Sequence, residues 1–221
     1  MDSDRVYYFT DASIIKHRHT FGGVKAMFSQ NDDIYILGNT CYRTYDTNDI
    51  HVLECMAILA ALNDIWANRY LKAFIVTDSN TCYDNIKKLA FAANKLAPYP
   101  KFFINKNRKP GERIAMLIDE LYRNWPYQID LQWDCVKSHV NSNVQWEKMK
   151  KYNPDCTFKD AMNFNRGNMI VDDLVSSFAY SVGVFEYLPV VSVKNILNRN
   201  WTELEVYHQS FLPQALNQVK Y

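Results

Sequence analysis

The sequence is poor in the residues that mark disordered, disulfide-bonded or strongly charged proteins. Only 6 of its 221 residues are Gly and 7 are Pro, which argues against long disordered tracts. Its 5 cysteines are odd in number and include no Cys-x-x-Cys pair, which argues against a disulfide framework or a zinc site. This use of cysteine favours a protein of the reducing cytosol. The formal net charge of +1 gives no global sign of a nucleic-acid binder, and any such partner must meet a local patch.

Signals for export and for membrane insertion are also missing. The N-terminus, Met1 to Arg5, is acidic and polar, unlike a secretory signal, and no apolar run approaches the length of a membrane span. We therefore expect a cytoplasmic protein with no membrane partner. The richness in Asn and Tyr is typical of an AT-rich genome, and a viral protein acting in a host cell is one interpretation of it.

Two apolar stretches of this sequence each end in a Thr-Asp pair. Residues 6–10 run into Asp11, and residues 73–77 run into Asp78. Both stretches are rich in β-branched and aromatic residues, which favours buried strands. Because sites in open α/β sheets lie at the carboxyl ends of strands, we expect the two carboxylates to meet at one edge of a sheet.

The remaining pattern alternates between strand and helix signals. Expected strands are 5–11, 24–29, 34–38, 73–78 and 128–136, and expected helices are 50–68, 80–94, 112–125 and 168–182. This order predicts an α/β fold, a mixed sheet that begins as an antiparallel meander and carries helices on its faces. Residues 140–167 are long, polar and Asn-rich, typical of a loop or lid, and residues 185–221 are too apolar for a free tail.

Two further acids lie on apolar faces of expected helices. Glu54 is the single charge on the apolar stripe of helix 50–68. A carboxylate facing a core is costly unless it is paired or binds a cation, and for Glu54 alone a Lys or Arg partner is the more frequent arrangement. Asp172 lies on the apolar face of the last helix, whereas Asp173 lies on the polar face, where the helix dipole explains it.

Together, Asp11, Glu54, Asp78 and Asp172 form a set of four carboxylates that cannot share one site unbound, because their repulsion would raise their pKa values. A pair of hard divalent cations such as Mg²⁺ removes this repulsion. Two such ions can activate a water molecule and stabilise the leaving oxygen of a phosphodiester. The pattern therefore favours metal-assisted phosphodiester hydrolysis.

Six short motifs in chain order carry a family resemblance: Tyr8–Ser13, Phe21–Gly23, Thr47-Asn48 with Glu54–Ala57, Val76–Ser79, Val136–His139, and Gly167–Val175. Over residues 5 to 183 this order resembles the ribonuclease H superfamily, closest to type 1 ribonuclease H. The resemblance implies a five-stranded mixed sheet and two Mg²⁺ or Mn²⁺ ions. It implies hydrolysis of the RNA strand of RNA–DNA hybrids to 3′-hydroxyl and 5′-phosphate ends.

The resemblance also assigns roles to residues. It makes Asp11, Glu54, Asp78 and Asp172 the metal ligands, and His139 the residue that assists nucleophile activation or product release. Candidate substrate-binding residues are Ser13, Asn48 and Asn168 near the site, and Lys106, Arg108 and Lys109 in a basic, aromatic-rich segment where type 1 enzymes place a basic protrusion. From charge alone, a solvated loop explains that segment equally well.

The sequence departs from the family pattern in two places, and other functions are compatible with it. Ser138 replaces the usual Gly before the His, and residues 140–166 are longer than the family's short loop, which suggests a lid or a partner-binding segment. We expect a catalytic domain over residues 1–184 and an extension over 185–221 that packs on it or on a protein partner. The alternatives are a junction resolvase or DNA nuclease on the same fold, and a non-catalytic nucleic-acid-binding or assembly module, against which the intact carboxylate set argues.

Overall fold

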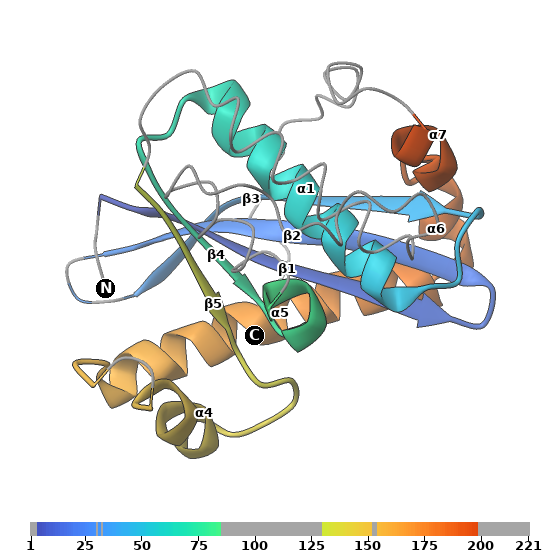
Figure 1. Ribbon diagram of the computed structural model, residues 1–221. Helices are drawn as coiled ribbons and strands as arrows, with labels where there is room; N and C mark the ends of the chain where they lie inside the picture. The colour runs from blue at the N-terminus through green and yellow to red at the C-terminus, as the bar shows by residue number, and fades with distance from the viewer. Residues whose placement is uncertain (1–3, 30, 32, 85–129, 152–153, 199–221) are drawn as a thin grey trace, which may run out of the picture.

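A mixed β-sheet with helices on both faces forms the protein. The computed structural model describes residues 4–29, 31, 33–84, 130–151 and 154–198 (Figure 1). Its strands are β1 (Val6–Ile15), β2 (Arg18–Phe28), β3 (Ile34–Thr44), β4 (Lys72–Thr77) and β5 (Asp130–Cys135), in the order β3-β2-β1-β4-β5. β2 is antiparallel to both β1 and β3, whereas β1, β4 and β5 are parallel. The predicted α/β fold with a five-stranded mixed sheet is confirmed.

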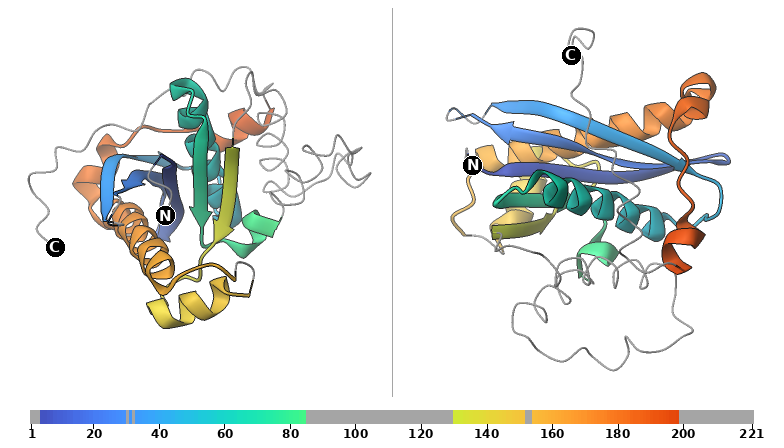
Figure 2. Two further views of the ribbon diagram at one scale, coloured as in Figure 1. Left: turned by 90° about the vertical axis from the view of Figure 1, so that its left-hand side faces the viewer. Right: turned by 90° about the horizontal axis from the view of Figure 1, so that it is seen from above.

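Two long helices cover opposite faces of this sheet (Figure 2). They are α1 (Ile50–Asn68) and α5 (Phe158–Tyr180). Successive side chains of a strand point to opposite faces, and β1 follows this rule. Tyr8 joins the core beneath α1, whereas Tyr7 and Phe9 join a second core beneath α5. The central strand is therefore buried on both sides and is held rigidly where it delivers Asp11.

Helix α1 begins and is buried as its sequence predicts. Its N-cap is Asp49, whose carboxylate accepts a 3.0 Å hydrogen bond from the His51 N–H. By length and composition alone, α1 could cross a membrane, so the expectation that no apolar run approaches such a span was wrong. However, 67% of its most apolar window is buried inside the fold, so packing against the sheet accounts for its apolar character.

Helix α5 packs directly on a side chain of β1 at one glycine. A Cβ atom added at Gly167 would lie 2.3 Å from the ring of Phe9, closer than any side chain allows. Further along the helix, the Thr20 hydroxyl of β2 donates a 2.8 Å hydrogen bond to the Val175 carbonyl. These contacts fix the height of α5 above the sheet, and thereby how far Asp172 lies from Asp11.

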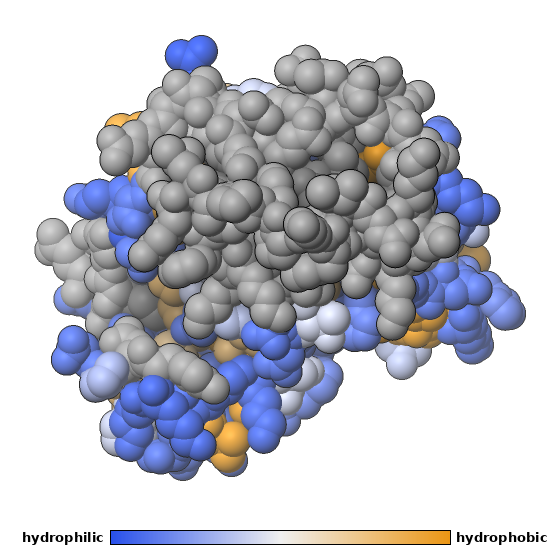
Figure 3. Space-filling model, in the orientation of Figure 1, coloured by the Kyte–Doolittle hydropathy of each residue, from blue (hydrophilic) through white to orange (hydrophobic). Residues whose placement is uncertain are grey.

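Residues 140–167 are not the irregular loop or lid that their composition suggested. They contain α4 (Ser142–Met149), and α5 already begins at Phe158 rather than at residue 168. The Asn141 side chain caps α4 by accepting from the Val144 N–H, and Thr157 forms a capping box at the start of α5. The surface over α4 is mainly hydrophilic, which explains why its apolar periodicity is weak (Figure 3).

Other expected boundaries were too narrow or lie outside the described residues. β1 runs on to Ile15, so it continues past Asp11 instead of ending there. β2 begins at Arg18 and β3 ends at Thr44, so the basic segment at residues 16–19 is half turn, at residues 16–17, and half strand, at Arg18 and His19. Residues 80–84 are helical, as expected after Ser79. The rest of that helix, the irregular segment at 95–111 and the helix at 112–125 lie outside the described part of the chain.

Residues 182–198 pack on the same body as the sheet. They form α6 (Val182–Tyr187) and α7 (Val193–Asn198). Phe185, Val191 and Ile196 are buried, the last two in the core beneath α1. The expected division at residue 184 falls inside α6, and the division itself remains a prediction because residues 199–221 lie outside the described part.

One carboxylate also binds the start of α7. Asp46 accepts hydrogen bonds from the Ser192 hydroxyl at 2.7 Å and from the N–H groups of Val193 and Lys194 at 3.1 Å. Burial tends to raise the pKa of Asp46, but these bonds and one from Thr44 outweigh it and lower that pKa below its usual value. The segment is thus tied to the loop that precedes α1.

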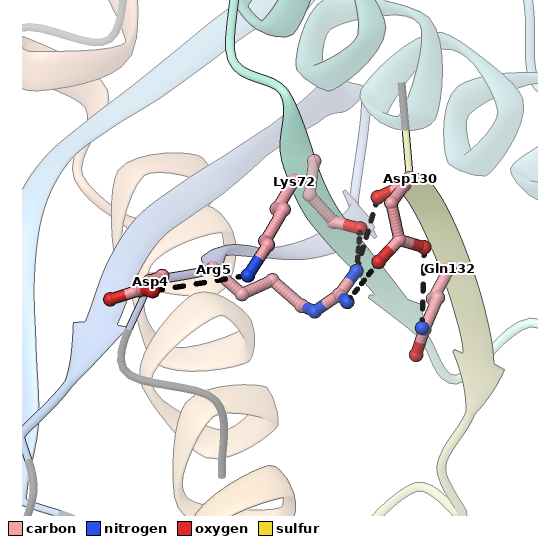
Figure 4. A network of polar contacts seen from close by, with 6 residues as sticks. Asp4, Arg5, Lys72, Asp130 and Gln132 are labelled. Carbon is pink, nitrogen blue, oxygen red and sulfur yellow. Dashed lines mark hydrogen bonds and ion pairs between the residues drawn. The ribbon is translucent and has the colours of Figure 1, made fainter. Parts of the chain in front are cut away.

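The edge strand β5 is held by a polar network at the amino ends of the parallel strands (Figure 4). The Arg5 guanidinium donates to the carbonyls of Ala73 and Asp130 at 3.2 and 3.0 Å, and it pairs with the Asp130 carboxylate. The hydrogen bond from Arg5 lowers the pKa of Asp130. This network lies at the opposite end of the strands from Asp11 and Asp78, so it fixes β5 without entering the candidate site.

Candidate metal centre

Three carboxylates converge where β4 ends beside the middle of β1. Asp11 lies in β1, Glu54 in α1, and Asp78 directly after β4, and their ligand oxygens all lie within 4.8 Å of one another. Thr10 and Thr77 are partners in the parallel β1–β4 register, so the aspartates that follow them are neighbours. Local chain geometry explains the pair of aspartates, and the packing of α1 on the sheet brings in Glu54.

Burial and mutual repulsion disfavour charge in this group. The pKa of Asp11 is raised to about 8, first by burial and then by the charge of Asp78, with a smaller contribution from Asp172. The pKa of Glu54 is raised well above its usual value by burial, then by Asp11 and Asp78, and to a smaller extent by Cys82. A hydrogen bond between Asp11 and Glu54 also couples the two groups. Without a cation, protonation is the way this group relieves its repulsion.

No basic side chain neutralises the group in the part of the chain that the structure describes. None of the three acids forms an ion pair there with a Lys or Arg, so the more frequent arrangement for an isolated Glu54 is not found. Glu54 is 6% exposed, and its Oε2 atom has no hydrogen-bond partner among the described residues. An unpartnered buried carboxylate oxygen beside two others is a donor set that suits a hard divalent cation.

Asp172 lies at the rim of the group rather than within it. It projects from α5, is partly exposed, and its Oδ2 lies 3.7 Å from His139 Nδ1. The Ser176 hydroxyl lies 3.4 Å from both the Asp172 carboxylate and the Ser13 hydroxyl, so it links α5 to β1. The structure thus places two predicted site residues, His139 and Ser13, around a third.

His139 sits on a short segment between β5 and α4. Its side chain is 76% exposed, and its backbone has a φ of 50°, in the left-handed region that non-glycine residues rarely adopt. Gln145 of α4 accepts a 2.8 Å hydrogen bond from the Lys137 N–H, and Lys148 donates to the Val136 carbonyl at 3.1 Å. Helix α4 therefore holds the segment that presents His139 to Asp172.

Sequence reasoning missed Gln145, Lys148 and Ser176. The first two lie in the stretch that was interpreted as a loop, so their orientation had no pattern to reveal it. Ser176 lies one helical turn after Asp172, and that spacing was the one available signal.

The other predicted residues have varied settings. Asn48 is exposed, immediately before the cap of α1. Asn168 is 4% exposed, one turn before Asp172 on α5, and its Oδ1 has no hydrogen-bond partner among the described residues. Lys106, Arg108 and Lys109 lie outside the described residues.

No family model and no curated protein sequence matches this chain. Solved structures do. The protease–reverse transcriptase of prototype foamy virus (PFV) is 17% identical with a TM-score of 0.55, and the match covers 80% of this chain and 21% of that one. The PFV RNase H domain is 16% identical with a TM-score of 0.52, and the match covers 80% of this chain and 93% of that domain.

The match therefore spans about a fifth of the length of the viral protease–reverse transcriptase but nearly all of the separate RNase H domain. At these identities the likeness concerns the fold, and it agrees with the strand order and the two helical faces described above. The chain has the ribonuclease H-like fold.

Proposed function

We propose that this protein is a metal-dependent endonuclease that cuts the RNA strand of RNA–DNA hybrids. The products would carry 3′-hydroxyl and 5′-phosphate ends. The observation that carries the proposal is the group of Asp11, Glu54 and Asp78, three carboxylates that converge on the sheet of a ribonuclease H-like fold. The alternative of a non-catalytic module would not require such a costly group to be kept in the core.

Asp11, Glu54 and Asp78 would hold divalent cations, Mg²⁺ or Mn²⁺, with Asp172 completing the set for a second ion from the rim. When bound, two such ions activate water and stabilise the leaving oxygen of a phosphodiester. The buried carboxylates contribute by being fixed in place: Asp11 is anchored by the Ala12 N–H at 2.8 Å, and β1 is packed on both faces. Little rearrangement is then needed for binding.

His139 would move a proton at the solvent edge of the site. Its ring is exposed, it lies 3.7 Å from Asp172, and its segment is held by Gln145. A histidine can both accept and release a proton near neutral pH. An ion pair with Asp172 through Nδ1 would orient the ring and leave Nε2 for the substrate or for a water molecule.

For the substrate, we propose that residues around the site read the hybrid. Ser13 lies beside Asp172 through Ser176, and Asn48 is exposed at the start of α1, so both can offer hydrogen bonds to 2′-hydroxyl groups. The basic residues Lys106, Arg108 and Lys109 would supply salt-sensitive phosphate contacts. Asn168 is buried, and we propose that it supports the substrate-binding residues from behind the site rather than contacting the hybrid itself.

The test is cleavage of a labelled RNA–DNA hybrid with Mg²⁺ or Mn²⁺, beside duplex RNA, duplex DNA and a four-way junction. We expect cutting only in the RNA of the hybrid, with loss of at least about a hundredfold in Asp78→Asn because a ligand is lost. Asp173→Asn is the matched control, because Asp173 is an exposed acid next to the site. Cutting of DNA or junctions would transfer the protein to another nuclease class, and equal activity in Asp78→Asn would refute the metal assignment.

A further inference from the structure

Two buried cysteines lie in contact directly behind the carboxylate group. The Sγ atoms of Cys55 and Cys82 are 3.2 Å apart, and the two residues are only 2% and 1% exposed. Cys82 is also held from the other side, since its Sγ lies 3.3 Å from the His51 carbonyl. All five cysteines lie in the described part of the chain and are free thiols, and the other three contact backbone or amide oxygens.

The chain places these thiols next to two of the proposed metal ligands. Cys55 follows Glu54 in α1, and Cys82 lies one helical turn after Asp78, in the helical segment that begins at residue 80. A link between the two sulfurs would therefore join the element that carries Glu54 to the element that follows Asp78. The proposed mechanism uses neither thiol.

We propose that Cys55 and Cys82 form an oxidation site, at which a small peroxide converts the two thiols into a reversible disulfide. One sulfur attacks a peroxide oxygen, the O–O bond breaks, and a sulfenic acid and water are produced. The second sulfur then attacks the sulfenic sulfur and releases a second water. In total, two thiols and one hydrogen peroxide give one disulfide and two waters, and a dithiol reductant reverses the change.

The disulfide changes the carboxylate site because the sulfurs must move. Their separation has to shrink from 3.2 Å to a bond length of about 2.05 Å, a movement of roughly 1 Å. Metal sites tolerate errors of only about 0.2 Å in ligand distances. Both cysteines are packed in the core, so a movement of this size disturbs the close packing beside Glu54 and Asp78.

The experiment treats the full chain with hydrogen peroxide and reads the linkage and the site separately. Mass spectrometry of the intact protein and of its non-reduced peptides should show loss of two hydrogens and a Cys55–Cys82 cross-link. The oxidised protein should bind Mn²⁺ more weakly and, resting on the proposed function, should cut the hybrid at least about tenfold more slowly until a dithiol is added.

In the variants Cys55→Ser and Cys82→Ser, peroxide should change neither Mn²⁺ binding nor cleavage. Two separate variants are used so that the test still stands if one of them fails to fold. Cys156→Ser, at a cysteine far from this pair in the chain, is the matched control and should respond as the wild type does. A cross-link between other cysteines, five free thiols after oxidation, or a Cys55–Cys82 disulfide with unchanged Mn²⁺ affinity would overturn the proposal. A reduced protein that cuts no substrate would refute the proposed function alone, because the cross-link and Mn²⁺ binding are measured without catalysis.

Discussion

Replacing Asp11 by Asn should make the metal-free protein more stable, although it removes a proposed metal ligand. In the folded chain, burial and the charge of Asp78 raise the pKa of Asp11 to about 8, from a usual value of 3.8. At pH 7 the unfolded state gains free energy by ionising this carboxyl, while the folded state keeps it largely protonated. The difference amounts to at most about 4 kcal/mol of lost stability, at roughly 1.4 kcal/mol per pKa unit.

The sign of the pH dependence follows from this shift. Since the folded state binds the proton more tightly than the unfolded state, the stability of the metal-free protein falls as pH rises from about 4 to about 8. An Asn side chain has no proton to lose, so this contribution vanishes. The variant and the wild type should be of similar stability near pH 4, should diverge as the pH rises, and should keep a constant difference above about pH 8.

The assay is urea unfolding in the presence of a chelator at several pH values, for wild type, Asp11→Asn and the exposed control Asp173→Asn. Adding Mg²⁺ should reverse the order, because the wild type gains binding free energy that the variant lacks. Parallel pH profiles for wild type and Asp11→Asn would refute the reasoning, since they would mean that folding does not raise the pKa of Asp11.

Three further predictions concern the packing and the polar contacts that hold the fold together. Gly167→Ala should lower the free energy of unfolding by about 1–3 kcal/mol through its clash with the neighbouring ring, whereas Gly183→Ala, with open space around it, should not, as thermal or urea unfolding would show. Asp46→Ala should cost about 1 kcal/mol and speed amide exchange at Val193, because the start of α7 loses its acceptor. Arg5→Ala should cost about 1–3 kcal/mol in urea unfolding because it leaves two strand carbonyls without their donor.

Much of the carboxylate group could be predicted because its signals are local. The apolar runs before Asp11 and Asp78 predict two neighbouring strands that lead to these aspartates, although β1 continues past Asp11 to Ile15. Glu54 follows from helical periodicity within α1, and the Asp49 cap marks where that helix starts. These features depend on residues within one or two turns of each other.

The features that were missed depend on weak or distant signals. Helix α4 is polar, so its evidence lies in its caps, Asn141 and the Thr157–Asp160 box of the following helix, rather than in an apolar stripe. The close fit of Gly167 on Phe9, and the contact between Cys55 and Cys82, join segments far apart in the sequence. Only the packed structure brings such pairs together.

Calorimetric titration of the protein with Mn²⁺ tests the central claim, that the buried carboxylates form a cation site, most directly. For the wild type near pH 7 we expect binding accompanied by proton release, because the raised pKa of Asp11 keeps a proton there that a cation displaces. Repeating the titration in buffers of different ionisation enthalpy measures those protons. Binding should be lost in Asp78→Asn and retained in Asp173→Asn. Equal binding by Asp78→Asn and the wild type, or no binding by either, would contradict the account.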